Sequence, residues 1–188
     1  MKKRVILVGK SAAGKDHARK ICQQWLGMKY QVSYTTRPPR DGEEHGVDYY
    51  FVEKTTFEEM ISQNLWYEYV MFNGWYYGTS KTQMEEANSV FIMTPAGLSH
   101  LSIPDRKESI VIYFDIDEET RRARMERRGG NADSVDRRIE ADRLDFETYT
   151  DYDAVINVPS YSIVDIYNIV SQHMPLPHKD KFFSAKVS

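Results

Sequence analysis

Short runs of apolar residues, rich in β-branched and aromatic side chains, recur along the chain with room for a helix after each of them. They span Val5–Val8, Ser89–Met93, Ile110–Phe114 and Ala154–Val158. The stretches around them place apolar residues at helical spacing, which predicts helices at residues 16–25, 56–63, 81–88, 118–127, 134–149 and 162–173. This alternation predicts an α/β fold with a parallel β-sheet core covered by helices.

The segment from Tyr30 to Ser80 does not follow this alternation. It is crowded with Tyr, Trp, Gly and Pro, which favours an inserted module that binds substrate. A chain of 188 residues is long enough for one well-filled core and too short for two ordinary domains. We therefore expect one domain that carries inserted segments.

Composition and charge limit the partners. The formal net charge is -3 at pH 7, so we expect no nucleic-acid partner, and phosphate recognition must come from local arginines. No apolar run approaches the ~20 residues of a membrane helix, so we expect no membrane partner and a cytoplasmic location. The single cysteine, Cys22, excludes an internal disulfide and is expected to be a core residue.

The first apolar run leads directly into a glycine-rich loop. It has the pattern Gly-x4-Gly-Lys, followed by one aspartate, in the residues Gly9, Lys10, Ser11, Ala12, Ala13, Gly14, Lys15 and Asp16. Such a loop curls so that successive N–H groups, with the positive end of the next helix, point at phosphate oxygens. Lys15 would then reach the β and γ oxygens, so the loop is predicted to bind a nucleoside triphosphate.

Asp16 stands where this loop pattern usually has Ser or Thr as a ligand of Mg²⁺. A carboxylate oxygen is a hard ligand and could hold Mg²⁺ directly or through water. The alternative is that Asp16 is only a favourable negative charge in the first helical turn. The residues alone leave both interpretations open.

Two arginines flank a diproline in the segment Ser33–Arg40. Pro38 and Pro39 are stiff, so they fix the separation of Arg37 and Arg40 before any ligand binds. Each guanidinium can donate two parallel charge-assisted hydrogen bonds to one phosphate. The pair therefore predicts a second phosphate site, with a solvated surface pair as the alternative.

Several motifs together resemble, in order and spacing, the substrate motifs of the guanylate kinase family. They are the loop at Gly9, Ser33–Arg40, Gly46–Val52, Glu68 and Gly74–Ser80, and the resemblance extends to about His173. The resemblance implies a P-loop NTPase fold with an inserted mixed α+β module for the nucleoside monophosphate and a helical lid. It also implies ATP and GMP as substrates, Mg²⁺ with ATP, and a monomer or dimer.

The resemblance assigns roles to side chains of the inserted module. Arg37, Arg40, Tyr49 and Tyr77 match the positions that bind the GMP phosphate, while Ser33, Glu68 and Thr79 match those that bind guanine. Chemistry agrees at Glu68, since a carboxylate can accept from N1–H and N2–H of guanine, whereas adenine presents an unprotonated N1. A buried polar group left unpaired in this way discriminates by a factor of about 10⁴.

Further roles fall near the C-terminal half. Arginine is dense from Thr120 to Arg143, and most of it is equally consistent with a solvated helix face. By resemblance Arg124, Arg128 and Arg138 contact the transferred phosphoryl group, with Gly129-Gly130 as a flexible segment. These cations and Lys15 would neutralise transition-state charge. Asn157 matches a position near the adenine of ATP.

The chain departs from the family at the end of the run Ser89–Met93. The family usually has Asp-x-Asp-x-Gln-Gly there, and this chain has Ile92-Met93-Thr94-Pro95-Ala96-Gly97. Because the second aspartate normally helps to bind the guanine side and supports the Mg²⁺ environment, Thr94 bears on specificity. We hypothesise that Asp16 supplies the carboxylate that this strand lacks.

These interpretations combine into one domain over residues 1–176, with a core (1–32, 85–124 and 146–176), a monophosphate-binding module (33–84), a lid (125–145) and a loose tail (177–188). The expected activity is transfer of phosphate from ATP to GMP, with dGMP as a further acceptor. One alternative is a kinase of another small phosphate ester, such as a ribose bisphosphate. The other is an inactive domain of this family that binds phosphorylated peptides, although such domains typically lose the loop residues that Gly9, Gly14 and Lys15 retain here.

Overall fold

The fold has two sheets, one in the core and one in the inserted module. The computed structural model describes residues 2–72, 74–128 and 134–176. In the described residues the core sheet has five parallel strands in the order β2-β7-β1-β8-β9. Their bounds are β1 (Arg4–Gly9), β2 (Lys29–Tyr30), β7 (Ser89–Ile92), β8 (Ser109–Phe114) and β9 (Ala154–Ile156).

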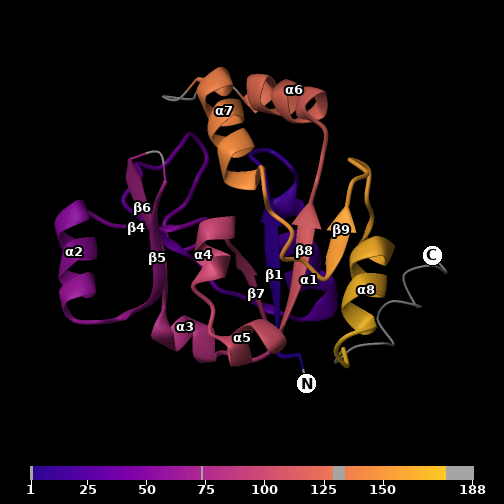
Figure 1. Cartoon of the computed structure of the whole chain (residues 1–188), viewed down its shortest axis with the longest axis horizontal. Helices are drawn as coiled ribbons and strands as arrows, with labels where there is room; N and C mark the ends of the chain where they lie inside the picture. The colour runs from indigo at the N-terminus through magenta and orange to yellow at the C-terminus, as the bar shows by residue number, and fades with distance from the viewer. Residues whose placement is uncertain (1, 73, 129–133, 177–188) are drawn as a thin grey trace.

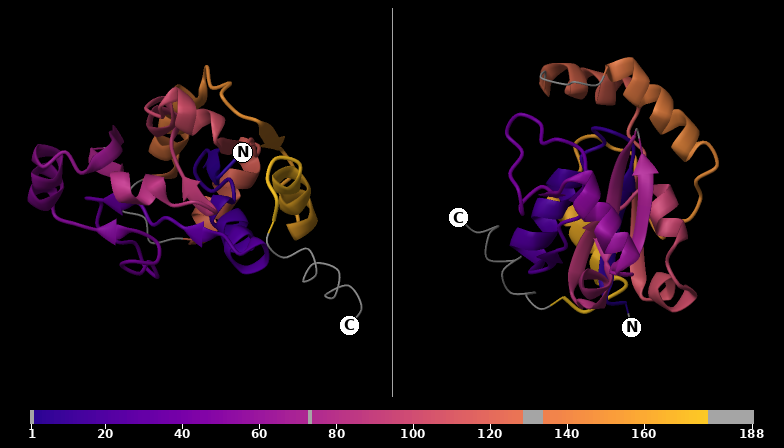
Figure 2. Two further views of the ribbon diagram at one scale, coloured as in Figure 1. Left: turned by 90° about the horizontal axis from the view of Figure 1, so that it is seen from below. Right: turned by 90° about the vertical axis from the view of Figure 1, so that its left-hand side faces the viewer.

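Helices cover both faces of the core sheet, as the alternation predicted (Figure 1). The helices outside the inserted module are α1 (Lys15–Leu26), α3 (Lys81–Glu85), α4 (Pro95–Ser99), α5 (Ile103–Lys107), α6 (Glu118–Arg128), α7 (Val135–Phe146) and α8 (Ile163–Ser171). The arrows of β8 and β9 point toward the end of the molecule that carries α6 and α7. Figure 2 shows these two helices lying across that end of the core. Loops at the carboxyl ends of the strands therefore open toward them.

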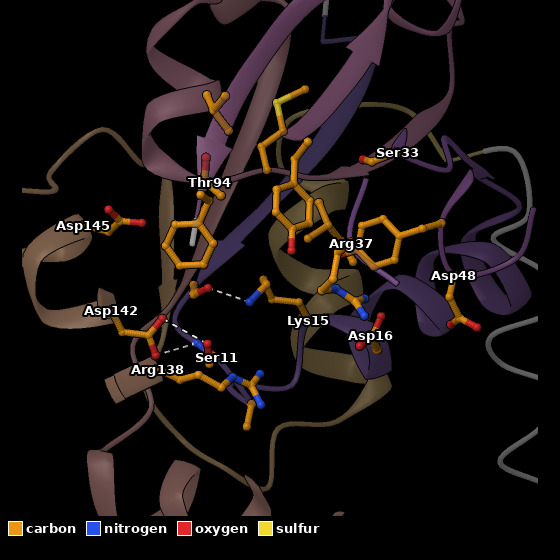
Figure 3. Close-up of a pocket in the computed structure, with 18 of the residues that line it drawn as sticks. Ser11, Lys15, Asp16, Ser33, Arg37, Asp48, Thr94, Arg138, Asp142 and Asp145 are labelled. Carbon is orange, nitrogen blue, oxygen red and sulfur yellow. Dashed lines mark hydrogen bonds between the residues drawn. The ribbon is translucent and has the colours of Figure 1, made fainter. Parts of the chain in front are cut away.

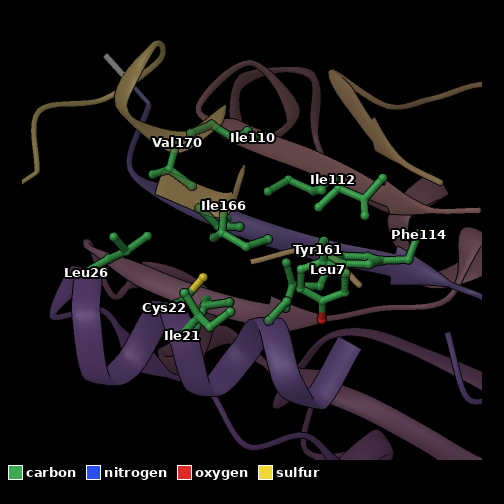
Figure 4. Packing of buried hydrophobic residues seen from close by; sticks show 14 of the residues in the cluster. Leu7, Ile21, Cys22, Leu26, Ile110, Ile112, Phe114, Tyr161, Ile166 and Val170 are labelled. Atoms are coloured by element: carbon green, nitrogen blue, oxygen red, sulfur yellow. The ribbon is translucent and has the colours of Figure 1, made fainter. Parts of the chain in front are cut away.

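Strand β1 shows why the apolar runs are continuous. Alternate residues of a strand point to opposite faces. Val5 and Leu7 pack in one cluster with α1 and α8, while Ile6 and Val8 pack in another on the opposite face. Figure 4 shows the first cluster, in which Leu7 and Ile112 from the sheet meet Cys22 of α1. Both faces need apolar residues, so no polar alternation appears in the sequence.

The module from residue 33 to 80 contains a second sheet with the strand order β4-β3-β6-β5. Its elements are β3 (Tyr34–Thr35), β4 (Tyr50–Phe51), α2 (Lys54–Ser62), β5 (Trp66–Phe72) and β6 (Trp75–Ser80). Phe57 of α2 stacks on Trp66, with ring centroids 4.1 Å apart. A Cβ on Gly78 would lie 2.9 Å from the Trp66 ring, so only glycine lets β6 pass beneath that ring.

Hydrogen bonds join this module to the core. The Tyr67 hydroxyl of β5 donates to Oδ2 of Asp105 at 2.6 Å. The other oxygen of Asp105 accepts from buried Arg4 of β1 at 2.9 Å. The strand that carries Glu68 is therefore fixed to the first strand of the core through one carboxylate.

Some predicted bounds differ from the structure. Helix α3 ends at Glu85 because Glu86 is extended (φ -68°, ψ 122°), so the predicted helix 81–88 is too long. Helix α7 ends at Phe146, short of the predicted residue 149. The short helices α4 and α5 and strand β2 were not predicted. Two signals for the helices are present in the sequence, since Thr94 and Ser102 cap them and a proline lies in the first turn of each.

Two predictions fall outside the described residues, namely the flexible Gly129-Gly130 and the loose tail 177–188. The predicted lid boundary at residue 125 lies within α6, which continues unbroken from Glu118 to Arg128. In the described part of the chain, no helix is both long and apolar enough to span a membrane.

Candidate active site

The loop between β1 and α1 contains two residues in the left-handed conformation. Gly14 has φ 104° and Ala12 has φ 58°, so both are left-handed. This conformation costs a residue with a Cβ about 1–2 kcal/mol, which Ala12 bears and Gly14 avoids. A Cβ on Gly9 would lie 2.9 Å from the carbonyl oxygen of Phe114, so the end of β1 also requires glycine.

Lys15 lies at the centre of the site (Figure 3). Its Nζ donates to the carbonyl oxygens of Gly9 at 2.5 Å and Lys10 at 3.0 Å. Burial lowers the pKa of Lys15 to about 8, although nearby Asp16 and Asp142 oppose the shift. The ammonium is thus desolvated within the loop, where an anionic ligand would stabilise its charged form.

A cavity of about 210 Å³ joins the loop to the inserted module. Most of the predicted site residues line it, from both sides: Gly9, Ser11, Ala12, Lys15, Asp16, Ser33, Arg37, Arg40, Tyr49, Glu68, Tyr77, Arg128 and Arg138. Thr94, Met93 and Ile92, which replace the family's acidic strand end, also line it. We call it the acceptor cavity. Segments that lie far apart in the sequence therefore meet around one space.

Glu68 is a buried carboxylate of the acceptor cavity on the side of the inserted module, with 7% of its surface exposed. It lies opposite Thr79 in the β5–β6 pair. Burial raises the pKa of Glu68 to about 7, although hydrogen bonds from Thr79 lower it in part. Thr79 is itself buried and is not among the residues that line the cavity, so its contact with the cavity is through Glu68.

Helix α4 begins beside Glu68. The Thr94 hydroxyl caps this helix by accepting from the N–H of Gly97 at 3.0 Å. A Cβ on Gly97 would lie 3.0 Å from Oε2 of Glu68 and 3.5 Å from Oγ1 of Thr94. The absence of a side chain at Gly97 thus leaves space for the carboxylate of Glu68, a role that the sequence pattern does not reveal.

The two arginines of the diproline segment have a shared carboxylate partner, Glu43. Arg37 is buried and donates to both oxygens of Glu43, at 3.0 and 2.8 Å. Arg40 lies 3.7 Å from the same carboxylate. Tyr49 lies under the Arg37 guanidinium, 5.4 Å from it. The pair is therefore held together before a phosphate binds, and Glu43 is a residue that the sequence analysis missed.

A second cavity, of about 460 Å³, lies on the outer side of the loop. We call it the donor cavity. It is lined by the loop and by lid-side residues: Ala12, Ala13, Gly14, Lys15, Asp16, His17, Arg124, Arg127, Arg128, Pro159 and Tyr161. Arg124 donates to the carbonyl oxygen of Ala12 at 3.0 Å, and the Tyr161 hydroxyl donates to that of Gly14 at 2.7 Å. His17 and Tyr161, to which the sequence analysis gave no role, are ring neighbours here.

Two predicted loop and donor residues lie outside both cavities. Lys10 points to Asp115, with Nζ 3.6 Å from its Oδ1. Asn157 is exposed just after β9 and is not among the residues that line either space. Both assignments stay predictions, as do the roles of the lining residues. Lys15, Asp16, Ala12 and Arg128 line both cavities, which places the loop between them.

A five-stranded parallel sheet, a phosphate-binding loop after its first strand and an inserted acceptor module define the fold of the P-loop kinases. The guanylate kinase family model matches residues 1–174. The guanylate kinase of Desulfitobacterium hafniense is 33% identical over 165 residues, which cover 81% of this chain and 80% of that protein. The chain belongs to the guanylate kinase family.

A further relative and a solved structure are also similar to this chain. The guanylate kinase of Fusobacterium nucleatum is 41% identical over 81 residues, so the match spans 43% of this chain and 44% of that relative. The chain thus spans under half the length of that relative. The crystal structure of a guanylate kinase from Anaplasma phagocytophilum superposes with a TM-score of 0.63 at 23% identity, over 92% of this chain and 85% of that one. That likeness supports the fold.

Proposed function

We propose that the protein transfers a phosphoryl group from ATP to GMP, giving ADP and GDP, with dGMP as a further acceptor. The observation that carries the proposal is the acceptor cavity, where Lys15 of the loop and Glu68 and Arg37 of the module line one space. A phosphate-binding loop and a buried carboxylate suited to guanine face each other there. No observation favours a base-free sugar phosphate or a phosphopeptide as the ligand.

Guanine would be selected by Glu68. As a carboxylate it accepts from N1–H and N2–H, while Ser33, which is buried at the cavity wall, can donate to O6. Thr79 orients Glu68 through its hydrogen bonds. Adenine would leave the buried carboxylate facing a lone pair, which is the arrangement that discriminates most strongly.

The GMP phosphate would be held by Arg37 and Arg40, with Tyr49 and Tyr77 beside them. One of its oxygens forms a bond to the γ-phosphorus of ATP as the bond from that phosphorus to the β–γ bridging oxygen breaks. The attacking oxygen is already anionic, so no general base is required. Lys15, Arg124, Arg128 and Arg138 would neutralise charge on the transferred group, which is the main demand of phosphoryl transfer.

Magnesium would come with ATP, and Asp16 is the residue proposed to hold it. Asp16 is exposed, lines both cavities and lies 3.6 Å from Nε of Arg19. Mg²⁺ keeps several waters and takes one or two carboxylates besides the substrate phosphates, so one carboxylate here suits it. The ion would neutralise phosphate charge. Ile92 and Thr94 line the same cavity, in agreement with a carboxylate relocated from that strand to the loop.

The Mg²⁺ proposal is tested by Asp16→Ala. We expect the variant to need a sharply higher Mg²⁺ concentration for half-maximal rate at fixed ATP. Asp41→Ala is the matched control, because Asp41 is an exposed aspartate that lines neither cavity. An unchanged magnesium titration would contradict the hypothesis that the Mg²⁺ carboxylate has moved from the strand to the loop. Asp16 would then be only a favourable negative charge at the start of the helix.

The activity is tested by ADP release with ATP and Mg²⁺ against GMP, dGMP, AMP, CMP, UMP, dTMP and ribose 1,5-bisphosphate. Turnover confined to GMP and dGMP supports the proposal. Turnover with the ribose bisphosphate would replace it with the sugar-phosphate alternative, and GMP binding without turnover would point to a binding domain. A cytoplasmic location, where ATP and GMP are available, belongs to the same proposal.

A further inference from the structure

The phosphate loop contains a residue whose conformation opposes its own side chain. Ala12 has φ 58°, a left-handed conformation that residues with a Cβ disfavour. Neighbouring groups hold the loop on both sides of it. Arg121 donates to the carbonyl oxygen of Ser11 at 3.4 Å, and Arg124 donates to that of Ala12 at 3.0 Å. Conformations of this kind persist where the surroundings over-determine them, often at ligand-binding sites.

The strongest of these restraints is a carboxylate from the other lid-side helix. Asp142 of α7 accepts from the N–H of Ser11 at 2.9 Å and from its hydroxyl at 3.1 Å (Figure 3). It also accepts from Nη1 of Arg121 in α6 at 2.8 Å. Asp142 and Arg121 are only 4% and 2% exposed, so their charges pair away from water. Hydrogen bonds to ionised groups are stronger than neutral ones. The bonds to Asp142 therefore fix both the backbone N–H and the hydroxyl of Ser11.

We propose that Asp142 is a positioning residue that presets the phosphate loop for the donor nucleotide. Its carboxylate fixes Ser11, with Arg121 as counter-ion, and so keeps Ala12 in the left-handed conformation that curls the loop. The N–H groups that follow are then aimed before the ligand arrives, and binding does not have to order them. The inference rests on the proposed function in one respect only, namely that ATP is the ligand of this loop.

The first test replaces Asp142 by Asn, which has the same shape but leaves Arg121 without an anionic partner. We expect the dissociation constant for ATP, measured by calorimetry, to rise about tenfold, the usual size for a lost hydrogen bond to a charged group. Asp142 and Ser11 also line the acceptor cavity, but the hydrogen bonds of Asp142 go to Ser11 and Arg121 and not to the diproline clamp or Glu68. The constant for GMP should therefore stay within twofold. Equal losses of ATP and GMP affinity, or no loss of ATP affinity, would overturn the proposal.

Asp136→Asn is the matched control. Asp136 also lies on α7 and pairs with α6, through Nη1 of Arg122 at 2.6 Å, but it is exposed and does not contact the loop. It should leave both dissociation constants within twofold. If it weakens ATP as much as Asp142→Asn does, general loosening of the two helices explains the effect, and the positioning role falls.

The second test asks whether Asp142 acts through Ala12. Glycine adopts φ near 60° without penalty, so an Ala12→Gly background should need the restraint from Asp142 less. We expect Asp142→Asn to weaken ATP binding about tenfold in the unsubstituted chain and at most about threefold in the Ala12→Gly background, since residues that share a restraint are non-additive. The same factor in both backgrounds would mean that Asp142 supports the fold generally, and would overturn the proposal.

A milder variant covers the case in which Asp142→Asn does not fold. Ser11→Ala removes the hydroxyl bond to Asp142 and keeps its ion pair with Arg121, and we expect it to weaken ATP about threefold with GMP unchanged. No change would overturn the proposal. If the unsubstituted chain itself does not bind ATP, the proposed function and this inference fail together. If it binds ATP and the variants match it, the inference fails alone.

Discussion

The phosphate loop and the acceptor module would hold their proposed ligands by opposite means. The loop is one stretch of eight residues that would bind phosphate through backbone N–H groups, and Asp142, Arg124 and Tyr161 form hydrogen bonds to it from outside. The module presents side chains from several separate segments, set on a small sheet that is tied to the core at Asp105. Backbone groups would recognise any phosphate chain, whereas Glu68, in its proposed role, would distinguish one base from another. Changes in the loop should therefore impair every acceptor alike, and changes in the module should alter which acceptor is used.

The largest effect is expected from Lys15→Met in the loop. Loss of a preorganised charge from the site of transfer should lower kcat with GMP and dGMP alike by about 10³. The Lys15 pKa is lowered to about 8 by burial, so the folded state disfavours the charged form, and at pH 7 that charge costs stability. The unfolding temperature should thus hold or rise. Steady-state ADP release measures kcat, and thermal unfolding measures the unfolding temperature. A small fall in kcat would contradict the role given to Lys15.

The next effect in size belongs to the module. Glu68→Gln replaces a pure acceptor by a group with an N–H₂ end, and kcat/KM for GMP should fall about 10²-fold because a buried polar contact becomes unpaired. The dissociation constant for ATP should not change. The comparison between the two regions fails if ATP affinity falls by a similar factor, since Glu68 would then act on the whole site.

The pH dependence of GMP binding also tests whether Glu68 binds guanine. The Glu68 pKa is raised to about 7, and only its ionised form accepts from both N–H groups of guanine. GMP affinity should therefore approach its maximum near pH 8, be about half of it near pH 7, and fall about tenfold per unit below about pH 6. Calorimetric titration from pH 5 to 8 measures this. The GMP phosphate also titrates, near pH 6. The control is therefore Glu68→Gln, in which the phosphate still titrates and the carboxyl is absent. A profile shared by both proteins would rule out Glu68 as the titrating group.

The same pKa affects stability with a definite sign. A carboxyl whose pKa is higher folded than unfolded contributes stability that is fully present below about pH 4.3, its unfolded value, and lost as the pH rises through about 7. Without nucleotide, the chain should therefore gain stability from Glu68 on acidification across this window, relative to Glu68→Gln. Denaturant unfolding of both proteins at pH 5 and pH 8 measures the difference.

The core and its phosphate loop could be predicted from local sequence patterns, whereas the acceptor module could not, because its site residues are scattered along the chain. The continuous apolar runs predicted four strands of the core sheet, and one contiguous motif predicted the loop. Strand β2, with two residues, is too short to show a pattern. The module residues were reached through the family resemblance, because they are scattered. Asp142 carries no local signal at all, since its partner Ser11 lies 131 residues away.

A smaller effect is expected in the phosphate clamp. Arg37→Lys keeps the charge but loses the planar guanidinium, in which Nη2 donates to both oxygens of Glu43 and Nη1 donates to the carbonyl oxygen of Pro38. Because a lysine cannot donate two parallel hydrogen bonds to a phosphate as a guanidinium can, KM for GMP should rise about tenfold while kcat changes little. KM for ATP is the internal control and should not move. A lysine variant equal to the unsubstituted chain would mean that Arg37 contributes only its charge.

The smallest effect tests how finely the module is set. Gly97→Ala adds a Cβ 3.0 Å from Oε2 of Glu68, so the carboxylate must shift by a few tenths of an ångström. Alanine is the better helix former by about 0.8–1.0 kcal/mol, so α4 itself should not weaken. We expect KM for GMP to rise about threefold with KM for ATP unchanged, a modest loss for a displaced but still formed hydrogen bond. In a Glu68→Gln background the same substitution should have no further effect on selectivity between GMP and AMP. An equal loss in both backgrounds would mean that Gly97 acts on the cavity by some route other than Glu68.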